Sequence, residues 1–323
     1  MPTFPLFRLP IVALIHLLEC MSPMILFNLS QSSKTSRELI KLINTKNLQL
    51  RIFSDRILIN PMYIFKIVPF LSTRTTRQIG NTSARVAQRT ANQMDVAWED
   101  MTEGFLIIMA HLTDLFGCTV YSYEYDRDAL EPSNHYRRIM KAVMEKQGGI
   151  KRLVIPITSN HWRFDHRWTM ENVKGVEELI SFDRIPPSVE FVSKLKFLEY
   201  GASCFGMSLL MAVDKSCEAI FLQNSELTMD NLKVFMNIWK SGGYPNLQYL
   251  SVENLWLLET EATEIIGVSI SQLEDKQNVW NMSKIVRGRI VQISHGVEVW
   301  SENGVRALMG IQRSRRTFIL YTL

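Results

Sequence analysis

The sequence predicts an α/β protein in which a small three-helix module precedes an irregular stack of strand–helix units. Apolar residues recur at helical spacing through the first 45 residues. From residue 95 onward, predicted strands and helices alternate, and successive strands are separated by about thirty residues. With 323 residues, 46% apolar and 21% charged, the chain has the composition of a globular protein. We assign residues 1–45 to the helical module and 46–323 to a second domain.

Three short helices account for residues 11–43. The apolar side chains of residues 14–21 follow the i, i+3, i+4, i+7 spacing of one helix face. Ser22-Pro23 is typical of a helix start, since Ser caps free N–H groups and Pro fits the first helical position. Thr35-Ser-Arg-Glu38 has capping-box spacing and predicts the start of the third helix. So small a module buries little of its apolar surface, which predicts a partner that covers the rest.

A membrane span or a signal peptide is the competing interpretation of residues 4–29. Charged and polar residues and three prolines interrupt this stretch before it reaches the roughly twenty apolar residues that a span needs. No clear small-residue cleavage site follows residue 18. We therefore expect a docking module.

Residues 4–34 resemble the F-box, in the form found in the large nematode F-box families. The resemblance lies in Phe4-Pro-Leu-Phe-Arg-Leu-Pro10, in the helix that ends at Met21-Ser-Pro23, and in Leu29-Ser-Gln-Ser-Ser-Lys34. It departs from the commoner pattern at Val12-Ala13, where an acidic residue usually follows Leu-Pro. The resemblance implies that the module binds the Skp adaptor, and through it a cullin, in a ubiquitin ligase. The expected contact residues are Leu9, Pro10, Leu14, Leu17, Leu18, Met21, Pro23, Leu26 and Leu29.

The second domain begins with two predicted strands, 48–53 and 56–59, joined by a tight turn at Ser54-Asp55. Residues 72–94 contain no Asp or Glu and hold Arg74, Arg77, Arg85 and Arg89 among polar residues. This composition favours a solvated basic loop. A patch that binds RNA or an acidic partner is the alternative, although no aromatic residues interleave the arginines as they do in nucleic-acid sites.

Strand–helix units follow. Residues 101–116 predict a helix closed by Gly117, residues 119–125 a strand, 136–146 a helix and 152–157 a strand. Residues 219–222 and 247–252 predict strands that flank a helix capped by Thr228. Residues 318–321 predict a final strand after a basic turn at 313–316. A repeat of about thirty residues is near the leucine-rich-repeat period, so we expect a leucine-rich-repeat-like stack.

This region also resembles the type 2 F-box-associated domain. The resemblance lies in Trp98-Glu-Asp100, Leu115-Phe-Gly-Cys118, Leu227-Thr-Met-Asp-Asn-Leu232, Phe235-Met-Asn-Ile-Trp239, Pro245-Asn-Leu-Gln-Tyr-Leu250, Glu302-Asn-Gly-Val-Arg-Ala307 and Phe318-Ile-Leu-Tyr321. It implies a domain that recruits a protein substrate, which it does not identify.

Signatures of catalysis are missing from the sequence, which has no GxGxxG, GxxxxGK[ST], GxSxG or HExxH motif. His161, Asp165 and His166 could ligate a metal, but no further ligand is evident nearby, so we expect neither a metal nor a cofactor. The same segment holds residue types that are enriched in protein interfaces, although a segment with no special role remains the favoured interpretation. The residues of this candidate substrate patch are Trp162, Arg163, Phe164, Arg167 and Trp168.

Four widely spaced cysteines predict neither a zinc site nor a disulfide framework. We expect Cys204 and Cys217 to be buried thiols rather than nucleophiles. A net charge of +4 does not indicate a nucleic-acid-binding protein. A reduced cytoplasmic or nuclear setting fits these features.

The sequence therefore predicts a non-catalytic substrate-recognition adaptor of a Skp–cullin–F-box ligase. The alternative is a repeat-type scaffold or nucleic-acid binder that never meets a ligase, and an enzyme dependent on His161 or His166 is the third hypothesis.

Overall fold

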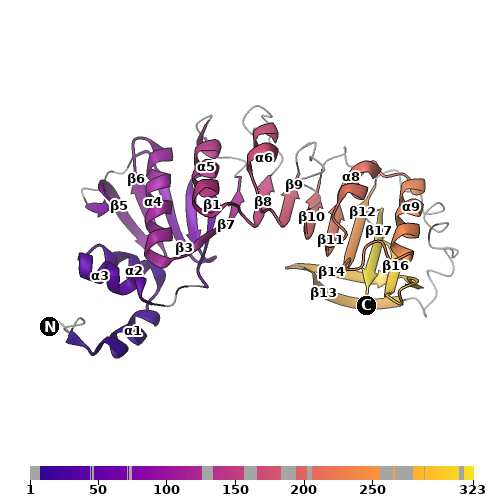
Figure 1. Cartoon of the computed structure of the whole chain (residues 1–323), viewed down its shortest axis with the longest axis horizontal. Helices are drawn as coiled ribbons and strands as arrows, with labels where there is room; N and C mark the ends of the chain where they lie inside the picture. Colours follow the sequence, from indigo (N-terminus) through magenta and orange to yellow (C-terminus); the bar gives the residue numbers. More distant parts are fainter. Residues whose placement is uncertain are drawn as a thin grey trace. The chain divides into compact units, whose positions relative to one another are not determined.

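The computed structural model describes residues 8–43, 45, 47–70, 72, 75–125, 134–155, 166–182, 194–201, 206–254, 265, 279–286, 288–312 and 316–323. The chain divides into two compact units, Met1–Ile150 and Lys151–Leu323. Figure 1 shows both units, in indigo to magenta and in magenta to yellow. Among the described helices, none is long and apolar enough to cross a bilayer.

Unit 1 opens with the three predicted helices, α1 (Ile11–Glu19), α2 (Pro23–Ser30) and α3 (Lys34–Lys41). The Ser22 hydroxyl accepts the N–H of Ile25 at 3.3 Å and Pro23 is the first residue of α2, as predicted. The predicted capping box at Thr35–Glu38 is wrong. Helix α3 begins one residue before Thr35, and the Ser33 hydroxyl accepts the N–H of Ser36 at 3.0 Å.

The sheet of unit 1 has the order β7-β1-β2-β3-β6-β5-β4. Its first two strands, β1 (Gln49–Phe53) and β2 (Arg56–Ile59), form the predicted antiparallel pair, and β3 (Tyr63–Val68) follows. Where a loop was predicted at 72–94, the structure has β4 (Thr76–Ile79), β5 (Thr82–Thr90) and the start of β6 (Gln93–Ala97). The loop prediction is wrong because Ile79, Ala84 and Val86 alternate with polar residues and are buried.

Two helices complete unit 1. Helix α4 (Met101–Phe116) ends at Gly117 as predicted, with φ of 56°. The Asp100 carboxylate caps its start by accepting the N–H groups of Thr102 and Glu103 at 2.8 and 3.1 Å, and these bonds help to hold the pKa of that carboxyl below its usual value. Strand β7 (Thr119–Glu124) pairs in parallel with β1, and α5 (His135–Gln147) then packs against α4.

Unit 2 is built on a sheet of order β15-β16-β17-β12-β11-β10-β9-β8. Five neighbouring strands are parallel: β8 (Arg152–Ile155), β9 (Glu178–Ser181), β10 (Phe197–Tyr200), β11 (Ala219–Leu222) and β12 (Tyr249–Glu253). Helices α6 (His166–Asn172), α8 (Met207–Ala212) and α9 (Met229–Lys240) lie between them in the chain. Thr228 caps α9 through a capping box with Asn231.

The C-terminal part of unit 2 departs from this strand–helix alternation. Strands β15 (Val297–Trp300), β16 (Arg306–Gln312) and β17 (Thr317–Thr322) are antiparallel and extend the sheet from β12. A mixed α/β class is thus confirmed, with three helices at the N-terminus, but so large a strand-rich sheet does not by itself show a leucine-rich repeat.

A separate hairpin, β13 (Val279–Val286) and β14 (Arg289–His295), packs on the face of the unit 2 sheet. Val286 and Val291 are 3% and 5% exposed and join one apolar cluster with Phe197, Tyr249 and Tyr321. The chain's division into units falls after Ile150, whereas the predicted domain boundary falls after residue 45. The three N-terminal helices therefore belong to a larger body.

Candidate functional site

The predicted contact residues, in and beside α1 and α2, fall into three groups by their exposure to solvent. Leu14, Leu18 and Leu26 are 3%, 0% and 3% exposed, so they hold the helices within unit 1. Leu17 is 37% exposed and Pro10 is also exposed. The remaining four are half-buried, namely Leu9, Met21, Pro23 and Leu29.

Three further apolar side chains of these helices meet solvent. Ile11, Val12 and Ile25 are 51%, 64% and 52% exposed. None of these three was among the predicted contacts, because spacing alone does not show which faces of α1 and α2 the rest of unit 1 covers. Together with Leu17, these residues form what we call the exposed helix surface: Ile11, Val12, Leu17 and Ile25.

The three helices are anchored to α4 and the sheet through α2 and α3. The ring of Phe27 meets the rings of Phe65 and His111 edge-on, with centroids 4.8 and 5.5 Å apart. The Gln31 amide nitrogen lies 3.0 Å from Nε2 of His111. Asp114 pairs with Arg37 at 2.8 Å and with Lys41 at 3.2 Å. Apolar packing and charge thus both fix the module in unit 1.

His111 is neutral in this setting. Its side chain is 5% exposed, and burial, aided by the nearby Arg37, lowers the pKa of His111 from 6.5 to about 4. Nδ1 of the ring is buried and bonds to no group among the described residues. Because the Gln31 amide nitrogen can only donate, Nε2 accepts and the proton of the neutral ring lies on Nδ1. A second proton would have to bind Nε2, where it would face the Gln31 N–H instead of an acceptor.

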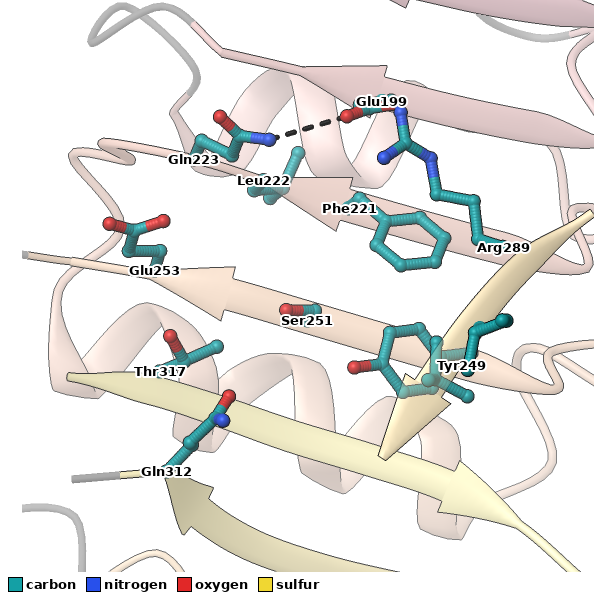
Figure 2. Close-up of a pocket in the computed structure, with 12 residues that line it drawn as sticks. Glu199, Phe221, Leu222, Gln223, Tyr249, Ser251, Glu253, Arg289, Gln312 and Thr317 are labelled. Carbon is teal, nitrogen blue, oxygen red and sulfur yellow. Dashed lines mark hydrogen bonds and ion pairs between the residues drawn. The ribbon is translucent and has the colours of Figure 1, made fainter. Parts of the chain in front are cut away.

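Unit 2 carries a second candidate site, a pocket of about 330 Å³ on the face of its sheet. Cross-strand register aligns Glu199, Phe221 and Ser251 in one row of side chains. Glu253 and Thr317 are partners in a neighbouring row. Figure 2 shows these side chains on the near face of the strands, with helices behind. The pocket spans the face of these strands from Tyr249, the first residue of β12, to Glu253, its last.

One ion pair forms a wall of this pocket. Glu199 is 1% exposed, and its carboxylate accepts the amide of Gln223 at 3.2 Å and pairs with the Arg289 guanidinium. Burial raises the pKa of Glu199, and the charge of Arg289 opposes this rise. The guanidinium carbon also lies 5.9 Å from the centroid of the Phe221 ring. Sequence reasoning missed these residues because 90 positions separate Glu199 from Arg289.

The predicted substrate patch falls mostly outside the described residues, which include neither residues 162–164 nor His161 and Asp165. Arg167 in α6 is exposed and pairs with Glu171 at 3.1 Å, while Trp168 is half-buried. His166 opens α6. Within the part of the chain that is described, no group of three His, Cys, Asp or Glu side chains is placed to hold a metal.

Cys217 is buried, as predicted, and Cys204 lies outside the described residues. Three of the four predicted patch arginines are described and lie on β4 and β5. Arg77 donates to Asn28 of α2, Arg89 pairs with Asp95 at 2.6 Å, and the Arg85 guanidinium carbon lies 6.0 Å from the Phe70 ring centroid. Arg74 lies outside the described residues. Arg77 and Arg89 thus have partners within unit 1, which lowers the charge available to RNA.

Comparison with known proteins gives one match within this chain. Searches of curated proteins and of solved structures returned no match. Among protein families, residues 6–48 match the F-box domain. This range contains α1, α2 and α3 and the whole exposed helix surface. Residues 6–48 are therefore an F-box domain, a module that implies an adaptor binding the Skp subunit of a ubiquitin ligase.

Proposed function

We propose that this protein is a substrate-recognition adaptor of a Skp–cullin–F-box ubiquitin ligase. The match of residues 6–48 to the F-box domain carries the proposal. The exposed helix surface supports it, because four large apolar side chains in solvent are what a docking partner covers. Leu9, Pro10, Met21, Pro23 and Leu29 complete the docking face, whereas Leu14, Leu18 and Leu26 shape it from within.

The adaptor contributes no catalytic group of its own in this proposal. It binds the Skp adaptor through the F-box domain, and through it a cullin, while unit 2 holds a protein substrate. Holding substrate lysines near a charged ubiquitin carrier raises their effective concentration, and such positioning is itself a large catalytic factor.

We further propose that the part of the chain after the F-box domain is an F-box-associated domain of type 2, in the form found in nematode families, with a leucine-rich-repeat-like core. The parallel strands β8–β12, with helices between them in the chain, support the repeat. The sheet face of unit 2 is then the surface that meets the substrate.

A pulldown with purified Skp adaptor tests the function. The full chain is expected to retain the Skp adaptor, and the double variant Leu17→Asp plus Met21→Asp is expected to lose it, because a charge in an apolar interface must shed its water. Val234→Asp is the matched control, since Val234 is a 48% exposed apolar residue on α9 of unit 2. An intact, folded chain that fails to retain the Skp adaptor would overturn the proposal in favour of the scaffold alternative.

A further inference from the structure

The pocket on the unit 2 sheet exists because small residues stand among large ones. In one cross-strand row of the sheet, Ser251 on β12 lies between Phe221 on β11 and Ile319 on β17. The next residue in this row is Gly310 on β16, which is the partner of Ile319. The Ser251 side chain is too short to fill the space beside the Phe221 ring. A hollow therefore opens above Ser251, as Figure 2 shows.

The β13–β14 hairpin closes only one side of this hollow. Its Val286 and Val291 pack on the row that holds Phe197, Tyr249 and Tyr321. The row with Glu253, Thr317 and Gln312 lines the pocket without forming part of that apolar cluster. The pocket is consequently an open recess of about 330 Å³, near the lower limit for ligand sites and suited to a side chain.

Its charges are unbalanced. Glu199, Glu253 and Arg289 are the charged residues that line it among those described. Arg289 is already paired with Glu199. No ion pair or hydrogen bond from another described residue reaches the half-exposed carboxylate of Glu253. Figure 2 shows Glu253 on the opposite side of the pocket from Arg289, which lies beside Phe221 and Glu199. Within the described part of the chain, one negative charge is left to attract a ligand.

The other lining groups suit the stem of a long side chain. The ring centroids of Phe221 and Tyr249 are 4.8 Å apart, and the two rings give the recess an aromatic wall. Thr317 is the cross-strand neighbour of both Glu253 and Gln312. A hydroxyl and an amide therefore lie in the same row as the Glu253 carboxylate. Arg289, between Glu199 and the Phe221 ring, shows a guanidinium held at this face by a carboxylate and an aromatic ring.

We propose that this pocket binds a basic side chain, an arginine or a lysine, of a protein ligand, with Glu253 as its counter-charge. The assignment of that ligand as a substrate of the ligase rests on the proposed function. The preference of the pocket for a basic side chain does not depend on that function. An anionic ligand is disfavoured, since it would meet Glu253, which has no counter-charge among the residues that the structure describes, and would have to take Arg289 from the buried Glu199.

Ligand-observed NMR on the full chain tests the pocket with acetylated, amidated pentapeptides whose central residue is Arg, Lys, citrulline or phosphoserine and whose other residues are Gly. We expect the Arg or Lys peptide to bind with a Kd at least about ten-fold lower than that of the citrulline peptide, which keeps the shape of Arg without its charge. Glu253→Gln should abolish that preference. Glu226→Gln is the matched control, because Glu226 is an exposed carboxylate of unit 2 outside the pocket.

Ser251→Leu is a second variant, without a change of charge, that fills the hollow and should also abolish binding. The proposal is overturned if no basic peptide binds, if citrulline binds equally, or if Glu226→Gln weakens binding as much as Glu253→Gln. Preferential binding of the phosphoserine peptide would overturn it as well. Each variant is also tested for retention of the Skp adaptor. A chain that binds basic peptides but not the Skp adaptor would contradict the proposed function and leave the pocket standing.

Discussion

Individual side chains couple the F-box domain to the rest of unit 1, and His111 is central among them. It lies on α4 and contacts Phe27 of α2 and Gln31, the residue that follows α2. Because burial lowers the pKa of His111 to about 4, the folded chain resists protonation that the unfolded chain accepts near pH 6.5. This contribution to stability is full above pH 6.5 and is lost as the pH falls toward 4.

We predict that His111→Gln reduces the pH dependence of unfolding between pH 6.5 and 4. The intact chain should lose on the order of 3 kcal/mol from this group over that range, since each pKa unit corresponds to about 1.4 kcal/mol. Urea unfolding at a series of pH values measures the difference. His16→Gln, at an exposed histidine of α1, is the control. Identical pH profiles for the intact chain and His111→Gln would contradict the assignment.

The ion pair of unit 2 gives a second prediction at this scale. Arg289→Met leaves the Glu199 carboxylate buried without its countercharge, and we expect a loss of about 2 kcal/mol in the free energy of unfolding at pH 7. This figure is below the usual cost of breaking a buried pair because the Arg289 side chain is 43% exposed.

Arg289→Met should also raise the pKa of Glu199 further. As the pH falls and this carboxyl is protonated in the folded state, the loss in the free energy of unfolding caused by Arg289→Met should become smaller. Adding Glu199→Gln to Arg289→Met should restore much of the stability at pH 7, as measured by chemical denaturation. If the single and double variants are equally unstable, the buried charge is not the cause.

Among the elements, α4 depends on a close approach that only glycine permits. A Cβ atom at Gly104 would lie 2.6 Å from the ring of Trp98, just before the helix. We predict that Gly104→Ala destabilises unit 1 by about 1–3 kcal/mol, because overpacking outweighs the better helix propensity of Ala. Thermal unfolding should show this loss, whereas Gly206→Ala, whose Cβ meets nothing within 4 Å, should be almost neutral. Equal stability of the two variants would exclude this packing role.

Elements governed by local rules were predictable from sequence. Helix α4 with its Gly117 cap, the β1–β2 pair and the Thr228-capped helix α9 all follow from periodicity and end signals. Strands β4 and β5 were missed because Thr, Ser, Gln and Arg occupy their outward positions and obscure the alternation of Ile79, Ala84 and Val86. Gly80, with φ of 61°, was the turn signal that could have revealed them.

The sites were predictable only in part, for a related reason. An F-box surface lies within one short segment, so its residues can be proposed from spacing. Which of them stay exposed depends on the contact of α2 with α4, and spacing does not reveal this. The pocket of unit 2 combines β10, β11, β12, β14, β16 and β17. The pairing and register of strands that are distant in the sequence create this pocket, and neither can be predicted from a single sequence.

At the scale of the whole molecule, the chain divides after Ile150, not at the end of the F-box domain. Phe27 packs on Phe65 and on His111, so the F-box domain shares a core with the sheet and α4 of its unit. We infer that binding the Skp adaptor engages unit 1 as one body, with α1 and the start of α2 as its contact surface. In the proposed function, substrate recognition is then left to unit 2.

Hydrogen exchange of the full chain with and without Skp adaptor is the most direct test of this account. We expect added protection of the backbone amides of residues 11–30 and unchanged exchange in β11 and β12 of unit 2. The same experiment on Leu17→Asp should show no protection, while Val234→Asp should behave as the intact chain does. Absence of protection in residues 11–30, or protection confined to residues 151–323, would contradict the assignment of the N-terminal helices as the docking surface.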